Sequence, residues 1–259
     1  MKGKVHVHVP WWYLTANYDE ALERIEKAGV GVELYLSAEE MDATTVSQWE
    51  RFLLPMVKRE IPFTLHAPFM DLSPGSADAW IRKVSIERWL QMVPLIDLVA
   101  PKVVVVHPGY NRCFYEEHIE DWQERTAEAL NVFIDSFTFN TKVGVENIFD
   151  RTPEPLRGLL EKADHPQIGC CFDVGHFNVF GTGSLQNWLE TLGRWIVELH
   201  IHDNRGENDD HHALGTGTAP IREAIVWSLS NLKEEPVFTI ESHTVEDLLA
   251  SLRYLDTLK

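Results

Sequence analysis

The segment HIHDNRGENDDHHALGTG, residues 200–217, contains four histidines, four acidic residues and three glycines. A buried strand is built from apolar residues, and a solvent-exposed loop has no need of so many imidazoles. Imidazole nitrogens and carboxylate oxygens are the ligands that zinc, manganese and similar divalent ions take from proteins. The composition of this segment therefore indicates a metal site.

Residues of the same types stand at the ends of most other apolar runs in the chain. They are Glu33, His66, His107, Glu146, Asp173, His200 or His202, and Glu241. A buried carboxylate is costly unless it is paired or bound to a metal. In a parallel barrel the C-terminal ends of all strands open onto one face, where such enzymes place their chemistry. We therefore expect these residues to converge on one metal-binding pocket.

The elements that would position them recur at a regular interval of about 33 residues. Short β-branched runs occupy residues 5–9, 30–36, 63–66, 103–107, 143–147, 168–173, 196–203 and 237–241. Helix-like segments between them include 18–29, with Gly29 suited to a C-terminal cap, 76–100, with Ser76 as a candidate cap, 116–137 and 242–258. This alternation predicts a single (β/α)8 TIM barrel, an α/β fold, over residues 1–259. An open doubly wound sheet is the alternative, but its GxGxxG phosphate-binding motif is missing.

Charge and hydropathy exclude several partners. Forty acidic residues against 23 basic ones give a net charge of −17, which opposes binding to nucleic acid and to anionic membranes. The sequence contains neither a signal-peptide pattern at its start nor an 18-residue apolar stretch. The three cysteines, Cys113, Cys170 and Cys171, have no CxxC spacing, and we expect reduced, buried thiols. A cytoplasmic protein with a small-molecule substrate is expected, and nothing in the sequence indicates its oligomeric state.

Several of the strand-end segments resemble those of one protein family. They are HAPFMDLSPGS (66–76), VVVHPG (104–109), VGVENI (143–148), FDVGH (172–176), HIHDN with DDHHALGTG (200–217) and ESH (241–243). Their order and spacing resemble those of the corresponding segments in the superfamily of xylose-isomerase-like barrels. That superfamily holds sugar and sugar-phosphate isomerases and epimerases together with endonuclease IV.

The isomerase branch of this resemblance implies one central divalent ion, which would be Mn²⁺, Zn²⁺ or Mg²⁺. Its ligands would be Glu146, Asp173, His200 and Glu241. In that branch the two glutamates, Glu146 and Glu241, are also catalytic, because they exchange a proton with the substrate carbon. The resemblance thus implies a central ion flanked by two bases.

The endonuclease branch implies up to three ions. One additional ion would be held by His66 and His107, which share Glu146, and the other by His176, Asp209 and His211. All of these positions are filled in this chain, but the isomerase branch also keeps several of them for substrate hydroxyls. These five residues are therefore candidates either for further metal ions or for substrate.

The loops beside the strand ends favour one of the two branches. Arg112, Arg151 and Arg205 are their only basic residues, and acidic residues surround them, which suits one small ligand better than a nucleic-acid duplex. We therefore expect an isomerase or epimerase of a small sugar, sugar phosphate or related polyol. The alternative is a zinc-dependent phosphoester hydrolase of the endonuclease IV type. Candidate substrate-binding residues are Glu33, His202, Arg205 and Trp12.

Overall fold

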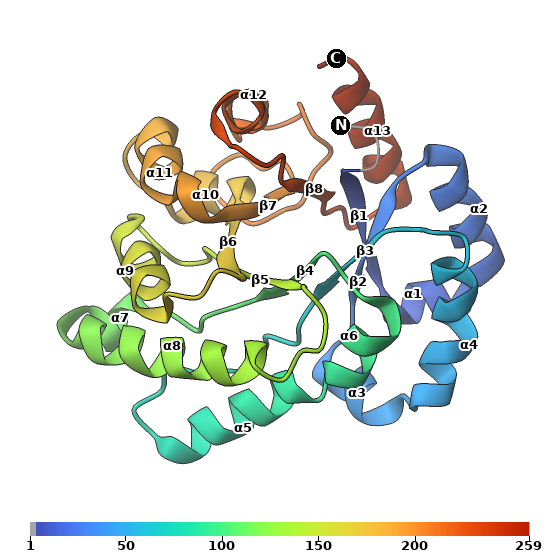
Figure 1. The fold of residues 1–259 in the computed structure, drawn as a ribbon. Helices are drawn as coiled ribbons and strands as arrows, with labels where there is room; N and C mark the ends of the chain where they lie inside the picture. The colour runs from blue at the N-terminus through green and yellow to red at the C-terminus, as the bar shows by residue number, and fades with distance from the viewer. Residues whose placement is uncertain (1–3, 259) are drawn as a thin grey trace.

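The computed structural model describes residues 4–258, and its core is a closed barrel of eight parallel strands (Figure 1). Neighbouring strands along the chain pair with each other, and the last strand pairs with the first. The strands are β1 Val5–Pro10, β2 Gly31–Tyr35, β3 Phe63–His66, β4 Val103–Val106, β5 Lys142–Glu146, β6 Ile168–Asp173, β7 Ile196–Ile201 and β8 Val237–Ile240. The predicted barrel and all eight predicted strands are confirmed, with small shifts at some strand boundaries.

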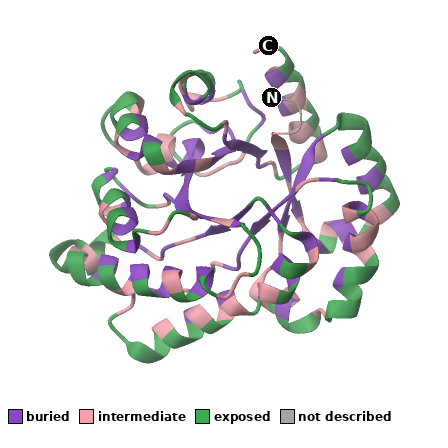
Figure 2. Cartoon of the chain, in the orientation of Figure 1, coloured by how far each residue is buried: buried purple, intermediate pink, exposed green. Residues whose placement is uncertain are grey.

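Helices surround the barrel and expose their outer faces, while the strands are buried (Figure 2). They are α1 Trp11–Ala16, α2 Tyr18–Ala28, α3 Ala38–Ala43, α4 Val46–Val57, α5 Ala79–Leu90, α6 Val93–Val99, α7 Arg112–Tyr115, α8 Ile119–Ile134, α9 Glu154–Ala163, α10 Val174–Phe180, α11 Leu185–Leu192, α12 Ile221–Asn231 and α13 Val245–Asp256, with short 3-10 helices η1 Glu116–His118 and η2 Gly193–Trp195. None of the helices within residues 4–258 is long and apolar enough to cross a membrane.

The helix boundaries differ from the sequence expectations in three places. The predicted helix 76–100 is divided into α5 and α6, because Pro94 in the first turn of α6 has no N–H to continue the preceding helix. Its N-cap is Asp78, which accepts hydrogen bonds from two backbone N–H groups, and not Ser76. The helices predicted over 116–137 and 242–258 begin later, at Ile119 and Val245. Gly29 does end α2 in the left-handed conformation, at φ +64°.

The cysteines agree only in part with the expectation of buried thiols. Cys170 and Cys171 are buried in β6, and burial raises the pKa of both thiols well above the usual range. Cys113, however, is exposed, because the short helix α7 that carries it lies on the surface of the molecule. All three are free thiols.

The loop after β7 is folded around the buried carboxylate of Asp203. Its Oδ1 accepts hydrogen bonds from the N–H groups of Asn204 at 2.9 Å and Ala219 at 3.0 Å. Its Oδ2 accepts from the N–H groups of Gly215 and Gly217, both at 2.9 Å. A side chain at Gly217 would come within 2.1 Å of the Asn204 carbonyl oxygen, so this close approach requires glycine. The loop that carries Asp209 and His211 therefore has its own internal support.

We predict that Asp203→Ala lowers the free energy of unfolding by about 3 kcal/mol, because four backbone N–H groups lose the buried charged acceptor that they share. Urea unfolding would measure this change. The matched control is Asp210→Ala in the same loop, where the half-exposed carboxylate lies 3.6 Å from the His212 ring. Equal unfolding curves for the two variants would contradict the role assigned to Asp203.

Candidate metal centre

The predicted ligands meet at the C-terminal end of the barrel. Glu146, Asp173 and His66 are the last residues of their strands, and His200 is the penultimate residue of β7. Glu241 directly follows β8 and His107 directly follows β4. The set is almost fully enclosed, since Glu241 is 6% exposed and Glu146, Asp173 and His200 are 0–1% exposed. Strands that lie far apart in the sequence thus place their ligand-type residues in one cluster.

The central group is arranged around Nδ1 of His200. This nitrogen lies 3.5 Å from Glu146 Oε1, 3.4 Å from Glu241 Oε1 and 3.9 Å from Asp173 Oδ2. Its other nitrogen, Nε2, lies 3.1 Å from Glu33 Oε2 and donates its hydrogen there. In the neutral imidazole, Nδ1 then points a lone pair at three carboxylates. That arrangement needs a cation in the space between them.

A second group shares the Glu146 carboxylate. Oε2 of Glu146 lies 3.3 Å from Nε2 of His66 and 3.1 Å from Nε2 of His107. Nδ1 of His66 lies 2.9 Å from the Ala67 carbonyl oxygen, which can only accept, so the ring hydrogen sits on Nδ1. Nε2 of the neutral His66 ring therefore faces the carboxylate without a hydrogen.

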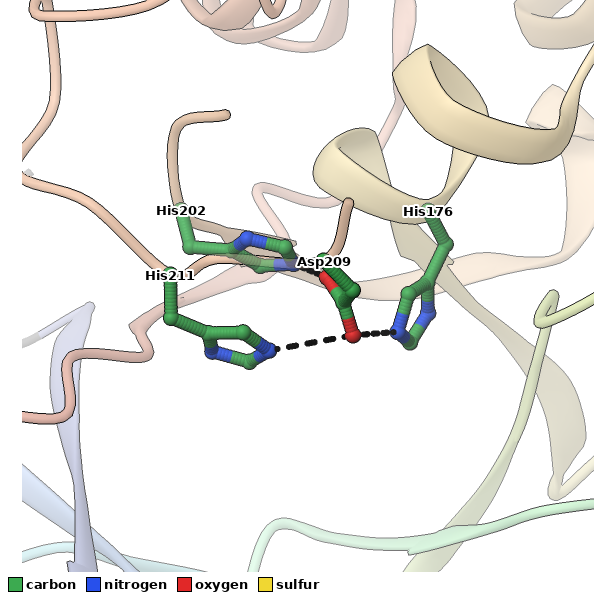
Figure 3. A group of neighbouring side chains, drawn as sticks. All are labelled: His176, His202, Asp209 and His211. Atoms are coloured by element: carbon green, nitrogen blue, oxygen red, sulfur yellow. Dashed lines mark hydrogen bonds and ion pairs between the residues drawn. The ribbon is translucent and has the colours of Figure 1, made fainter. Parts of the chain in front are cut away.

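A third group consists of His176, His202, Asp209 and His211 (Figure 3). Asp209 Oδ2 lies 3.2 Å from Nε2 of His176 and 3.3 Å from Nε2 of His211. Nδ1 of His176 donates to the Asn147 carbonyl oxygen at 3.1 Å, which again leaves Nε2 free to act as a ligand. All of the ligand residues implied by the family resemblance are therefore brought together, in three adjoining groups.

These donor sets fit divalent ions. Several of their buried atoms form no hydrogen bond with the described residues, among them Asp173 Oδ2, His200 Nδ1 and Asp209 Oδ1. Buried polar atoms without partners are costly unless an ion or water satisfies them. Mixed imidazole and carboxylate ligands suit Zn²⁺ or Mn²⁺.

The pKa values of the cluster show the same need for positive charge. Burial lowers the pKa of His176 and His200, but neighbouring acidic groups outweigh it, so both pKa values lie well above the usual range. Burial raises the pKa of Glu146, but the imidazoles of His200, His107 and His176 hold it well below its usual value. The raised pKa values favour protonated His176 and His200 when no metal is bound. A metal ion that binds to these histidines must displace the protons.

Glu33 lies beneath the central group and does not line the mouth of the pocket. It is fully buried, and its two oxygens contact His200 Nε2 at 3.1 Å and His8 Nδ1 at 3.0 Å. A carboxylate that contacts both imidazoles inside the barrel can orient His200. The substrate-binding role expected of Glu33 stays a prediction.

The other expected substrate residues divide between the cluster and the surface. His202 is fully buried and belongs to the third group. Trp12 on α1 is 63% exposed, and Arg205 in the loop after β7 is also exposed. Neither forms a hydrogen bond or ion pair with the metal-ligand candidates of the described chain, so the substrate contacts expected of them remain a prediction.

Sequence reasoning missed Glu198, a fully buried carboxylate on β7 two residues before His200. Its Oε1 accepts a hydrogen bond from the Thr239 hydroxyl. Burial and the nearby charge of Glu33 raise the pKa of Glu198 to about 8. The alternation along VELHIH could have revealed it, since residues 198, 200 and 202 share one face of the strand.

Replacing Glu198 by Gln should change how stability depends on pH. The pKa of Glu198 keeps this group protonated in the folded chain up to pH about 8, whereas the unfolded chain loses the proton near the ordinary value of 4.5. Wild-type stability should therefore fall relative to Glu198→Gln as pH rises from 5 to 8, by at most about 1.4 kcal/mol per pH unit. Urea unfolding in EDTA would measure this, with exposed Glu207→Gln as the control. Parallel curves for wild type and Glu198→Gln would contradict the prediction.

A family model described as xylose isomerase-like TIM barrel matches residues 16–258. The chain belongs to this family. Among curated relatives of this family member, the Methanocaldococcus jannaschii protein MJ1311 is 28% identical over 79% of this chain and 73% of its own length. A probable endonuclease 4 of Sulfurihydrogenibium sp. is 25% identical over 67% of this chain and 68% of its own length.

Two solved structures extend the comparison. The crystal structure of a D-tagatose 3-epimerase-like protein superposes with a TM-score of 0.81 at 24% identity, over 98% of this chain and 96% of that one. The TTHB071 protein of Thermus thermophilus, from a crystal soaked with ZnCl2, gives a TM-score of 0.78 at 26% identity, over 98% and 97% of the two chains. These likenesses cover almost the whole of both chains and agree with the family assignment.

Proposed function

We propose that this xylose isomerase-like barrel is a metal-dependent hydrolase of a phosphoester carried by a small molecule. The observation that carries the proposal is the position of Glu146 between two ligand groups. Its Oε2 faces His66 and His107 at 3.3 and 3.1 Å, and its Oε1 faces His200 at 3.5 Å. A carboxylate in this position can bridge two neighbouring ions, as the paired metal sites of phosphoester hydrolases require.

When bound, paired divalent ions lower the pKa of a coordinated water and neutralise charge on the phosphoryl group. The residues of this chain then have separate tasks. Glu241, the most exposed of the four central residues, can accept the proton that the attacking water loses. His8 lies 3.6 Å from Glu241 Oε1 and is 19% exposed, so it can pass that proton toward solvent. The new P–O bond forms from this water, the old P–O bond breaks, and the leaving alcohol oxygen takes up a proton.

The net charge of −17 favours a small substrate over a duplex. A nuclease must neutralise several backbone phosphates, whereas a single exposed arginine such as Arg205, in the loop after β7, could serve one phosphate group. The likeness to a probable endonuclease 4 supports phosphoester hydrolysis as the class of reaction. The kind of substrate is inferred from the residues of the site and the charge of the chain.

Isomerisation or epimerisation of a small sugar, sugar phosphate or polyol is the second candidate. It is supported by the central quartet, in which Glu146 Oε1 and Glu241 Oε1 lie 3.5 and 3.4 Å from the same His200 nitrogen, as two bases around one ion would. The surroundings of Glu146 weigh against it. Four imidazoles lie within 3.1–3.5 Å of its two oxygens, so both oxygens face ligand-type nitrogens.

A parallel assay separates the two reactions. With Zn²⁺ or Mn²⁺ added, we expect p-nitrophenol release from p-nitrophenyl phosphate or bis(p-nitrophenyl) phosphate, and no deuterium uptake from D2O into a ketohexose. Glu146→Gln and Glu241→Gln should each lower the hydrolysis rate by at least ~100-fold, because each carboxylate loses its charge as a ligand or base.

Glu207→Gln, on the exposed part of the loop, is the control and should keep wild-type activity. An abasic-site DNA duplex should remain unbound at moderate salt. Deuterium incorporation without hydrolysis, abolished by the same two glutamine variants, would replace the proposal with the isomerase.

A further inference from the structure

The third ligand group contains one residue more than the family resemblance assigned to it. His176, Asp209 and His211 were implied, and the structure adds His202, which directly follows β7. One ligand atom from each of the four lies within 4.8 Å of the others. Figure 3 shows the rings of His202 and His211 lying one above the other, with Asp209 between them and His176.

The charged groups beside the His202 ring are the carboxylates of Asp173 and Asp209. His202 is fully buried, and neither ring nitrogen forms a hydrogen bond that meets geometric criteria within the described chain. Its Nε2 lies 3.5 Å from Asp209 Oδ1, which also lacks a hydrogen bond there. One ion bound by both atoms would satisfy these two buried groups.

We propose that His202 is the fourth ligand of a closed metal site, together with His176, Asp209 and His211. Three imidazoles and one carboxylate would supply a four-ligand set for Zn²⁺ once the His202 or His211 ring turns out of their parallel stack. Zinc sites with four protein ligands are structural, whereas catalytic zinc keeps a position open for water or substrate. The ion in this group therefore holds the loop after β7 in place, and the reaction is left to the two groups that share Glu146.

The backbone of the loop supports this role. His211 has a left-handed conformation, with φ +51°, which is uncommon for a residue with a side chain. Such strain persists only where the surroundings compensate for it. A metal bond to His211 is one such compensation, because it joins the loop to His176 on α10 and to His202 at the end of β7.

An alternative hypothesis is that His202 binds no metal and only orients a ligand of the central ion. Its Nε2 also lies 3.2 Å from Asp173 Oδ1, so the ring could donate a hydrogen bond to a ligand of the central ion. Substitution by glutamine distinguishes the two roles. The amide N–H of glutamine can replace the hydrogen-bond donor, but the glutamine side chain is a poor zinc ligand. His202→Gln should therefore disable a closed zinc site and spare a hydrogen bond.

The experiment uses the full chain loaded with zinc alone and freed of excess metal by gel filtration. Zinc per chain is then counted by mass spectrometry of the metal. His202→Gln should hold one zinc fewer than wild type, and Asp209→Asn should show the same deficit. His212→Ala is the control, because this exposed neighbour lies in the same loop and its ring faces Asp210, which belongs to none of the ligand groups. It should retain the wild-type number.

A structural role for the ion predicts a second change that needs no substrate. Trypsin can cut after Arg205, which is exposed in this loop. Cleavage there should be at least tenfold faster in zinc-loaded His202→Gln than in wild type or His212→Ala. Circular dichroism would confirm that each variant remains folded.

Three results would overturn the inference. The first is an unchanged zinc number in His202→Gln. The second is loss of every zinc, which would show that His202 acts through Asp173. The third is an equal deficit in His212→Ala. Because metal content and cleavage are measured without a reaction, the test can succeed or fail whichever reaction the chain catalyses.

Discussion

The carboxylate of Glu146 is the interaction on which the rest of the site depends. It is 1% exposed, and each of its oxygens faces two imidazoles that come from different parts of the chain. An isolated buried charge of this kind is strongly unfavourable, so the fold must keep compensating positive charge beside it. Protonated histidines provide that charge in the metal-free chain, and divalent ions in exchange for protons would provide it in the active protein.

The barrel meets this demand through its backbone as much as through its side chains. The carbonyl oxygens of Ala67 and Asn147 accept the ring hydrogens of His66 and His176, and Glu33 accepts that of His200. In each case the remaining nitrogen is directed at a carboxylate. Rigid parallel strands fix these donors and acceptors before any ion arrives, which lowers the cost of ordering the site.

Much of this could be predicted from the sequence, because the signals are local and periodic. Apolar runs at a regular interval specify the barrel, and a polar residue at the end of such a run must lie at its mouth. Asp173 and His200 were found in this way. The division into three groups depends on side-chain directions across strands, which no single segment of sequence encodes.

Where prediction failed, tertiary contacts had changed the environment of a residue. Glu33 was expected at a strand end, yet it is the middle residue of β2 and contacts His200 inside the barrel. Cys113 is an ordinary small residue that the surface helix α7 leaves exposed. The raised pKa of Glu198 follows from complete burial beside Glu33, and only the closed barrel creates that proximity.

Anomalous diffraction at the zinc edge from crystals of the zinc-loaded chain tests the central claim most directly. We expect two zinc peaks that share Glu146, one beside His66 and His107 and the other beside Asp173, His200 and Glu241. A single peak bound by Glu146, Asp173, His200 and Glu241, with His66 and His107 free of metal, would contradict it.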